Sequence, residues 1–481
     1  MLDLSSKTTT QPRSVILFEL NEVPYKILNW YCDLKPNSHV ARLATQSRRY
    51  RTYVSESGGK SLQPVSTWST LHRGVNPDQH KVRAFGQPLD RADAQYPPIW
   101  RILAEHGATV GVFGSLLSYR VPENLTNYAF YFPEPLANEP VTHPAYLSPF
   151  QEFNLAMSRL SGRQVSTTIN WKLVSRIIPT LPRLGLSAKS CVAVVRQLVG
   201  ERINPATKGR RRSIQSLLAF DIFIKELQEK KPAFSTFFTN HVASAQHRFW
   251  AALFPEDYPN SHYSQKWIDL YKHEIEYAMN VVDGFAGSLM DFVARNPNYL
   301  LLVASSMGQE AFNTEPNASY LAIDNFPRFM SGLGFAPTQY EQRSVMMPCY
   351  GVALKAEYID QFRQKLDSIS IDGKGLTVEY HDGGYFLIDF SYTNYEGPRS
   401  LQLDGKEISF ETLGISVTED EEGAYLSADH QPEGTLLVYD PLDAKTASNP
   451  PENEKISVLE IAPSILRQFG IPVPSYMATR T

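Results

Sequence analysis

The stretch SVILFEL, Ser14 to Leu20, decides the fold expected for this chain, because it is a short apolar run rich in β-forming residues. The turn-compatible residues NEVP follow it, and YKILNWY then takes up helical spacing. Further along, PIWRILAEHG predicts a helix that ends at Gly107, and ATVGVFGS returns as a strand over Thr109 to Phe113. A strand, a crossover helix and a second strand in this order indicate a parallel sheet with helices on its faces. We therefore expect an α/β protein built on a mostly parallel, doubly wound sheet.

The remaining patterns divide the chain into four segments. Residues 14–144 form the first part of the predicted core, and residues 233–375 form its second part, which begins with the strand-like run AFSTFFTNH. Between them, residues 145–232 carry helical patterns broken by Pro179, Pro182 and Pro205, which predict a helical insertion that acts as a lid over a pocket. Residues 376–481 carry short β-like runs with glycine turns and then a helical pattern. This last segment predicts a small antiparallel element and the C-terminal part of the core.

The composition limits the partners and the compartment. Lys plus Arg number 46 and Asp plus Glu number 50, and the resulting net charge of -4 predicts no general attraction to nucleic acid. Three widely spaced cysteines argue against a disulfide framework, and no apolar run reaches the roughly 20 residues needed for a transmembrane segment. The polar start also lacks the pattern of a signal peptide, so we expect a cytoplasmic location. The oligomeric state is left open.

A local exception to this charge balance is the run KGRRR, Lys208 to Arg212. Basic runs of this kind are common in solvated surface loops, and they also contact phosphate groups or lipids. The sequence leaves both interpretations open.

Polar residues gather where the predicted strands end. Ligands of open parallel sheets bind at the carboxyl ends of the strands, so these positions carry the most weight for function. The residues are Glu19, Asn21 and Glu22 after the first strand, Asn240, His241 and His247 after AFSTFF, Ser305, Ser306 and Gln309 after YLLLVA, and Asp429 and His430 before TLLVYD.

Three of these residues are candidate metal ligands. His241, His247 and His430 could form a facial set of imidazoles, which suits zinc, manganese or iron, and a carboxylate such as Glu19 or Asp429 could complete it. The competing interpretation is that each histidine packs in the core or lies on the surface.

Candidate nucleophiles lie in KSLQPVSTWSTLHRG, Lys60 to Gly74. A metal ion or a base could lower the hydroxyl pKa of Ser61, Ser66 or Thr67 and so activate it. Serine and threonine at such positions also serve as turn or cap residues.

Taken in order, the motifs resemble the alkaline phosphatase superfamily, in particular its type I phosphodiesterase and nucleotide pyrophosphatase branch. STLHRGVNPDQHKV is similar to the turn after the nucleophile, QHRFW to a metal-binding histidine motif, DHQPEGTLLVYDP to the late histidine, and ISVLEIAPSILRQFGIPVP to the C-terminal helix. The resemblance implies an alkaline phosphatase-like fold with His247 and His430 as two ligands of one metal site. It covers roughly residues 15–114, 234–308 and 428–474, and not the insertion.

Other positions depart from the family pattern. The aspartate after the first strand is replaced by Glu19 or Asn21, the aspartate and histidine of Ser-Asp-His-Gly fall on Ser306 and Met307, and the nucleophile position falls on Pro64. A two-metal site, which would hold the attacking and leaving oxygens in line, is therefore hard to build.

The sequence thus supports two functions above a purely structural role. The first is a divergent hydrolase or transferase that acts on a phospho- or sulfo-ester, either a small molecule or one linked to a glycan or lipid. It would use one zinc or manganese ion at His247, His430 and His241, Ser66, Thr67, Glu19 and Asn21 as catalytic residues, and Asn240, Ser306 and Gln309 as substrate-binding residues. The second is a catalytically inactive family member that binds a ligand or a protein partner through the former active-site pocket.

Overall fold

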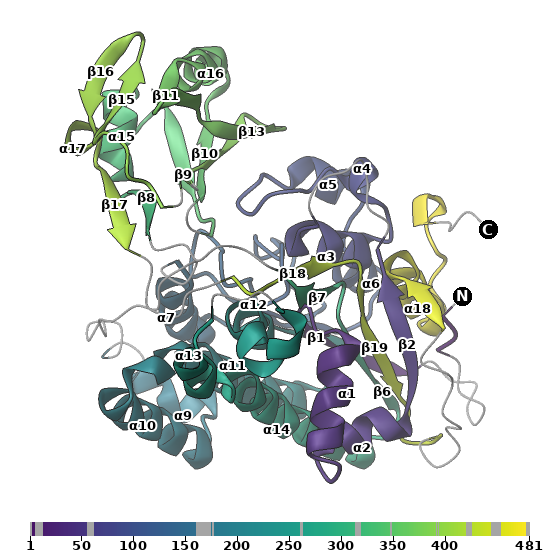
Figure 1. Cartoon of the computed structure of the whole chain (residues 1–481). Helices are drawn as coiled ribbons and strands as arrows, with labels where there is room; N and C mark the ends of the chain where they lie inside the picture. The colour runs from purple at the N-terminus through teal and green to yellow at the C-terminus, as the bar shows by residue number, and fades with distance from the viewer. Residues whose placement is uncertain are drawn as a thin grey trace.

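The structure is a computed structural model, and it describes residues 2–4, 13–54, 62–159, 175, 178–259, 263–312, 319–346, 349–390, 392, 394–419, 426–443 and 454–477. Its centre is an eight-stranded sheet with the strand order β20-β2-β19-β6-β1-β5-β3-β4 (Figure 1). The strands are β1 (Ser14–Leu20), β2 (Ser47–Tyr53), β3 (Val110–Phe113), β4 (Tyr128–Phe132), β5 (Phe234–Thr239), β6 (Tyr299–Ala304), β19 (Glu433–Tyr439) and β20 (Lys455–Ser457).

The sheet is mostly parallel, as predicted. β1 lies in its middle and pairs in parallel with β5 on one side and β6 on the other. β3 pairs in parallel with both β4 and β5, whereas β19 runs antiparallel to β2 and β6. Because the neighbouring parallel strands β1, β5 and β6 end at the same edge, the residues that follow them meet there.

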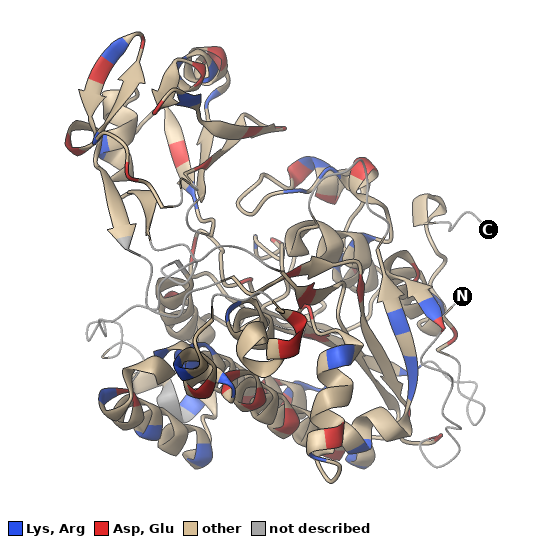
Figure 2. Ribbon diagram, in the orientation of Figure 1, with Lys and Arg blue, Asp and Glu red and all other residues tan. Residues whose placement is uncertain are grey.

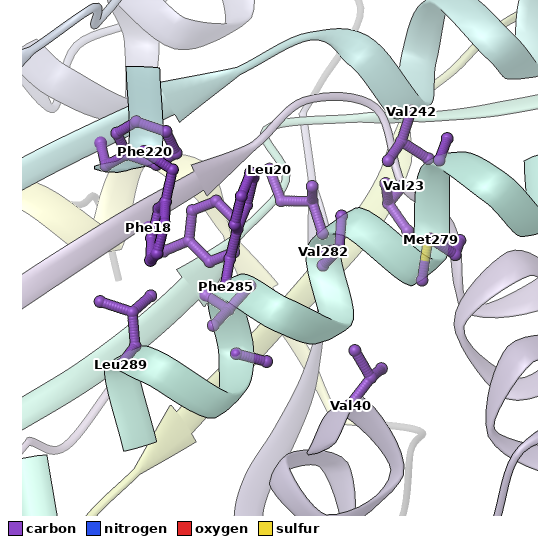
Figure 3. Packing of buried hydrophobic residues seen from close by; sticks show 14 of the residues in the cluster. Phe18, Leu20, Val23, Val40, Phe220, Val242, Met279, Val282, Phe285 and Leu289 are labelled. Carbon is purple, nitrogen blue, oxygen red and sulfur yellow. The ribbon is translucent and has the colours of Figure 1, made fainter. Parts of the chain in front are cut away.

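The alternation of side chains along β1 supplies a hydrophobic core on each face of the sheet. Ile16, Phe18 and Leu20 belong to one cluster of buried residues, and Val15 and Leu17 belong to the other. In the first cluster, Phe18 packs beside residues of two helices, Phe220 and Phe285 among them (Figure 3). Burial on both faces explains why SVILF is a continuous apolar run, and it confirms the doubly wound arrangement.

Helices cover both faces. The first cluster is built with α1 (Tyr25–Leu34), α2 (His39–Gln46), α11 (Arg211–Lys230), α12 (His241–Leu253), α13 (Gln265–Tyr271) and α14 (Glu274–Arg295). The second is built with α3 (Pro64–Arg73), α5 (Asp90–Gln95), α6 (Ile99–Glu105) and α18 (Ile461–Gln468). Among the described residues, no helix is both long enough and apolar enough to span a membrane.

The described parts of residues 145–232 are mostly helical. This segment holds α7 (Ser148–Arg159), α9 (Leu181–Leu184), α10 (Ala188–Ile203) and α11. Its last helix also serves the core, because Phe220, Phe223 and Leu227 of α11 are buried in the first cluster. α11 thus connects β4 to β5 as a crossover helix on that face of the sheet.

An antiparallel region projects from the main body (Figure 1). It has its own hydrophobic cluster, which includes residues from Leu321 to Ile415. We expected the segment that begins at residue 319 to belong to the second part of the core. Its short strands instead share this separate cluster with residues that follow 376. The region contains β8 (Ser319–Ile323), α15 (Phe326–Gly332), β9 (Tyr340–Arg343), β10 (Cys349–Leu354), α16 (Ile359–Asp367), β11 (Ile369–Ile371), β12 (Lys374–Gly375), β13 (Thr377–His381), β14 (Tyr385–Asp389), β15 (Ser400–Leu403), β16 (Lys406–Ser409), α17 (Phe410–Leu413) and β17 (Ile415–Glu419).

Candidate metal-binding site

The site begins where β1 ends. Glu22 follows the strand in a left-handed backbone conformation, with φ of 56°, and its side chain is buried. Its carboxylate Oε1 accepts a hydrogen bond from Asn21 Nδ2 at 2.7 Å, and its backbone carbonyl accepts one from Gln246 Nε2 at 3.1 Å. The sharp turn after the strand therefore aims a fully buried carboxylate at the carboxyl edge of the sheet.

Two histidines from distant parts of the chain meet this carboxylate. Nε2 of His247, on α12, lies 3.0 Å from Glu22 Oε2, and Nε2 of His430, on β18 (Ala428–Gln431), lies 3.4 Å from the same oxygen. One ligand atom from each of the three residues falls within 4.8 Å of the other two. Glu22, His247 and His430 are called the Glu-His-His cluster below.

The opposite nitrogen of each ring fixes its orientation. His247 Nδ1 lies 2.8 Å from the carbonyl oxygen of Ala428, and His430 Nδ1 lies 2.8 Å from that of Leu62. Since a carbonyl oxygen can only accept, both Nδ1 atoms carry the proton and donate. Each neutral ring would then offer an unprotonated Nε2 towards Glu22, which is the arrangement found in metal-ligating histidines.

The buried carboxylate of Glu22 is stabilised by positive charge on the neighbouring histidines. Burial alone would raise the pKa of the Glu22 carboxyl, but the charge and hydrogen bonds of His430 and His247 outweigh it and hold that pKa well below its usual range. Burial alone would lower the pKa of His430, but the charge and hydrogen bond of Glu22 raise it to about 9. Either a proton on Nε2 or a bound cation can therefore neutralise the buried carboxylate.

Gln309 supports the cluster from β7 (Gly308–Ala311). Its Nε2 donates to Glu22 Oε2 and, at 3.2 Å, to the carbonyl of Ala243. β7 pairs antiparallel with β18, which places Gln309 opposite His430. The backbone of Gly308 packs closely against the backbone of Glu433. Only glycine fits there, because a Cβ atom at position 308 would lie 2.2 Å from the carbonyl oxygen of Glu433. The Gly-Gln pair of SSMGQE thus braces the carboxylate with an amide.

A cavity of about 490 Å³ lies beside the cluster. Glu22, His247 and His430 line it together with Asn21 and Asn240, whose amides bond to each other at 2.7 Å. Another part of its wall is apolar and includes Phe85, Phe113, Leu116, Phe132, Leu136 and Phe238. Arg212 of α11 and Arg248 of α12 also line it, so the basic run noted in the sequence contributes to this wall.

Glu19 and His241 lie outside the cluster. Glu19 points to the opposite face of the sheet from Phe18 and Leu20, and its Oε1 lies 2.8 Å from Nε2 of the buried His72. His241 lines part of the cavity, but its Nδ1 lies 2.7 Å from the Thr239 hydroxyl and its Nε2 lies 3.1 Å from the carbonyl of Ala278. Both ring nitrogens are thus occupied by the protein, and the structure does not bring His241 to the carboxylate.

The hydroxyl candidates are also separate from the cluster. The Thr67 hydroxyl lies 2.8 Å from that of Ser306, and both residues are buried. Ser66 sits in the first turn of α3 and is partly exposed, and neither Ser66 nor Thr67 lines the cavity, whereas Gln63 and Pro64 do. Ser61 lies outside the described residues.

The carboxylate that lies beside the two histidines differs from those expected from the sequence. Glu19 and Asp429 were proposed to complete the ligand set, but Asp429 is half exposed and lies 3.6 Å from His430 Nδ1, away from the Nε2 atoms. Glu22 lies beside both Nε2 atoms instead, because the chain turns after Leu20. The signal available in the sequence was its position, two residues beyond an apolar strand and before Val23 and Pro24.

The chain is similar in structure to several solved proteins. No protein-family model matches the chain, and no curated protein matches it. Similar structures include murine ectonucleotide pyrophosphatase/phosphodiesterase 5 (10% identity, TM-score 0.40, covering 96% of each chain). They also include alkaline phosphatase from the Antarctic bacterium TAB5 (11%, 0.39, 96% of this chain and 99% of that one) and phosphonoacetate hydrolase from Sinorhizobium meliloti 1021 (12%, 0.40, 97% and 100%).

Proposed function

We propose that the Glu-His-His cluster binds one divalent metal ion, zinc or manganese, and that the protein is a hydrolase or transferase acting on a phospho- or sulfo-ester. The observation that carries the proposal is the convergence of three ligand atoms whose orientation is fixed by neighbouring groups. Two backbone carbonyls hold the histidines, and Gln309 with Asn21 holds the carboxylate.

The donor set fits such an ion. Two imidazole nitrogens and one carboxylate oxygen form the ligand set of many catalytic zinc sites, in which a fourth position stays open for water or substrate. The ion would replace the Nε2 proton that the buried carboxylate otherwise requires. When bound, it would act as a Lewis acid and lower the pKa of a coordinated water towards about 7.

The chain's own residues would bind and orient the substrate. Arg212 and Arg248 give the cavity wall positive charge beside the cluster, which favours a negatively charged ester. The phenylalanines of the apolar wall would hold a bulky apolar part of the substrate, such as an aryl or acyl group, and exclude water from it. The Asn240 side chain lines the same space, and because its Oδ1 accepts from Asn21 Nδ2, its own Nδ2 would donate to an ester oxygen.

Water is the nucleophile that this arrangement favours. The Thr67 hydroxyl is hydrogen-bonded to the Ser306 hydroxyl, and neither Ser66 nor Thr67 lines the cavity. A role for these hydroxyls in catalysis would require α3 to move relative to the sheet.

A second candidate function is that of a binding protein without catalysis. It is favoured by the charge balance of the cluster, because protonated His430 and ionised Glu22 satisfy each other without a metal ion. The same cavity would then bind an anionic, partly apolar ligand.

Ester hydrolysis separates the two functions. The purified protein, supplied with zinc or manganese, is assayed with bis(para-nitrophenyl) phosphate, para-nitrophenyl phosphate and para-nitrophenyl sulfate. We expect turnover of at least one ester that falls by about 100-fold or more in the variant His247→Ala and stays within about threefold in Glu19→Gln. Absence of turnover in the native protein, together with saturable binding of the same esters, would favour the binding protein.

A further inference from the structure

Helix α10 buries three polar side chains and leaves four large apolar side chains exposed. The residues it buries are Ser190, Gln197 and Glu201. The side chains it exposes include Val192, Val195, Val199 and Ile203, with exposed fractions of 55, 61, 55 and 82%. An ordinary surface helix of a globular protein shows the opposite pattern, so this orientation requires an explanation.

Specific contacts hold the helix in this orientation. Glu201 accepts a hydrogen bond from Nε of Arg211, on α11, at 2.8 Å, and the two side chains form a partly buried ion pair. Gln197 Nε2 donates to the carbonyl of Thr207 at 2.8 Å. A rotation that buried the valines would break both interactions and leave Glu201 charged without its partner.

The exposed apolar residues form one stripe with cations beside it. Positions 192, 195, 199 and 203 follow helical spacing and lie on one side of α10. Lys189, Arg196 and Arg202 are exposed on the same helix, and its one acidic residue, Glu201, is buried. α10 lies at the outer edge of the molecule (Figure 1), and Figure 2 marks Lys and Arg on the ribbon there. Within the described chain, this face therefore combines apolar groups with positive charge.

We propose that the exposed face of α10, formed by Val192, Val195, Val199, Ile203 and the three cations, binds the surface of a membrane that contains anionic lipids. An apolar stripe with Lys and Arg beside it is the pattern of a helix that lies in the membrane interface. The valines and the isoleucine enter the boundary between headgroups and acyl chains, while the cations contact the anionic headgroups. The protein as a whole carries a net charge of -4, so the attraction is local to this face. Binding through α10 requires no metal ion.

The test is cosedimentation of the full-length protein with vesicles. We expect binding to vesicles of phosphatidylcholine mixed with phosphatidylserine, weaker binding to phosphatidylcholine alone, and a decrease with added salt. The charge reversal Arg196→Glu with Arg202→Glu should weaken binding by at least about 30-fold, because each cation near an anionic surface contributes a factor of roughly five. The double variant Val195→Asp with Val199→Asp should bind no more than background.

Matched controls keep the result interpretable. Both valines are exposed, so the double variant should keep the circular dichroism spectrum and melting temperature of the native protein. Val141, 49% exposed and far from α10 in sequence, receives the same change as Val141→Asp, which should leave vesicle binding unaltered. Native protein that fails to bind mixed vesicles, or α10 variants that bind as well as Val141→Asp, would overturn the proposal. So would a native dimer that the valine variant converts to monomers without any vesicle binding, since the face would then join two copies of the chain.

Discussion

Glu22 Oε2 and His247 Nε2 lie 3.0 Å apart, although Glu22 follows the first strand of the sheet and His247 lies on the helix after β5. The sheet brings them together because β1 and β5 are parallel neighbours whose carboxyl ends share one edge. His430 approaches the same oxygen from the ribbon formed by β7 and β18. We propose that the three side chains together hold one metal ion.

Glu22→Gln should change the protonation of His430 in the metal-free protein. Burial lowers the pKa of His430, and the substitution removes the two largest effects that oppose it and leaves only those of Asp429 and the Leu62 carbonyl, so we expect this pKa to fall from about 9 to below its ordinary value of 6.5. A folded-state pKa raised above the unfolded value adds stability that is full below pH 6.5 and is lost as pH rises through about 9. Metal-free native protein should therefore lose up to about 3 kcal/mol across that window, and Glu22→Gln should not. Proton NMR titration of the His430 ring and urea unfolding at each pH measure both effects.

Glu19→Gln is the matched control for Glu22→Gln, because it makes the same change three residues earlier on the chain. Glu19 pairs with the buried His72 rather than with the cluster. We expect unchanged metal affinity and a loss of about 1–3 kcal/mol of unfolding free energy, since the substitution disturbs a buried hydrogen bond between Glu19 and His72. If Glu19→Gln lowered metal content as much as Glu22→Gln, the assignment of Glu22 as the ligand would be wrong.

His241→Asn should leave metal content intact and change the response to acid. Burial lowers the pKa of His241 to about 4, so the folded protein resists protonating a ring that the unfolded chain protonates near 6.5. Such a group removes stability as pH falls from 6.5 towards 4. Urea unfolding should show this acid-dependent loss in the native protein and a smaller one in His241→Asn. Loss of metal from His241→Asn, by contrast, would return His241 to the ligand set.

Gln309→Met tests whether the amide positions the carboxylate. The substitution keeps the length of the side chain but removes the donor that contacts Glu22 Oε2. We expect metal affinity to fall by about 10- to 100-fold, the usual cost of losing a group that orients a ligand. Competition with a chelating dye measures the affinity. Gln431→Met, which removes a donor to the backbone carbonyl of Gln309 instead, serves as the control and should lower affinity much less.

Much of the fold could be predicted from the hydrophobic pattern of single strands and helices. SVILFEL alternates between two buried faces, so its apolar run specified a central parallel strand. The antiparallel region was harder to delimit. Its first strands, such as Ser319–Ile323 and Cys349–Leu354, look like further core strands in sequence, and only their shared cluster separates them from the main sheet.

Two of the three histidines expected from the sequence come together in the structure, and the carboxylate beside them is not the one expected. His247 and His430 were chosen from motif order, and the structure brings their rings together. Glu19, Asn21 and Glu22 follow one another so closely that the choice depends on the strand's last pleat and on the left-handed turn at Glu22. His241 begins a helix, and its ring contacts Thr239 and the carbonyl of Ala278, and sequence alone does not place the distant Ala278 beside it.

The most direct test of the metal site is elemental analysis of purified native protein beside His247→Ala and Glu22→Gln, with Glu19→Gln as the control. After incubation with zinc or manganese and removal of excess ion, we predict about one ion per chain in the native protein and in Glu19→Gln, and far less in the other two. Native protein that retains no ion, or a His247→Ala variant that retains as much as the native protein, would contradict a metal site at Glu22, His247 and His430.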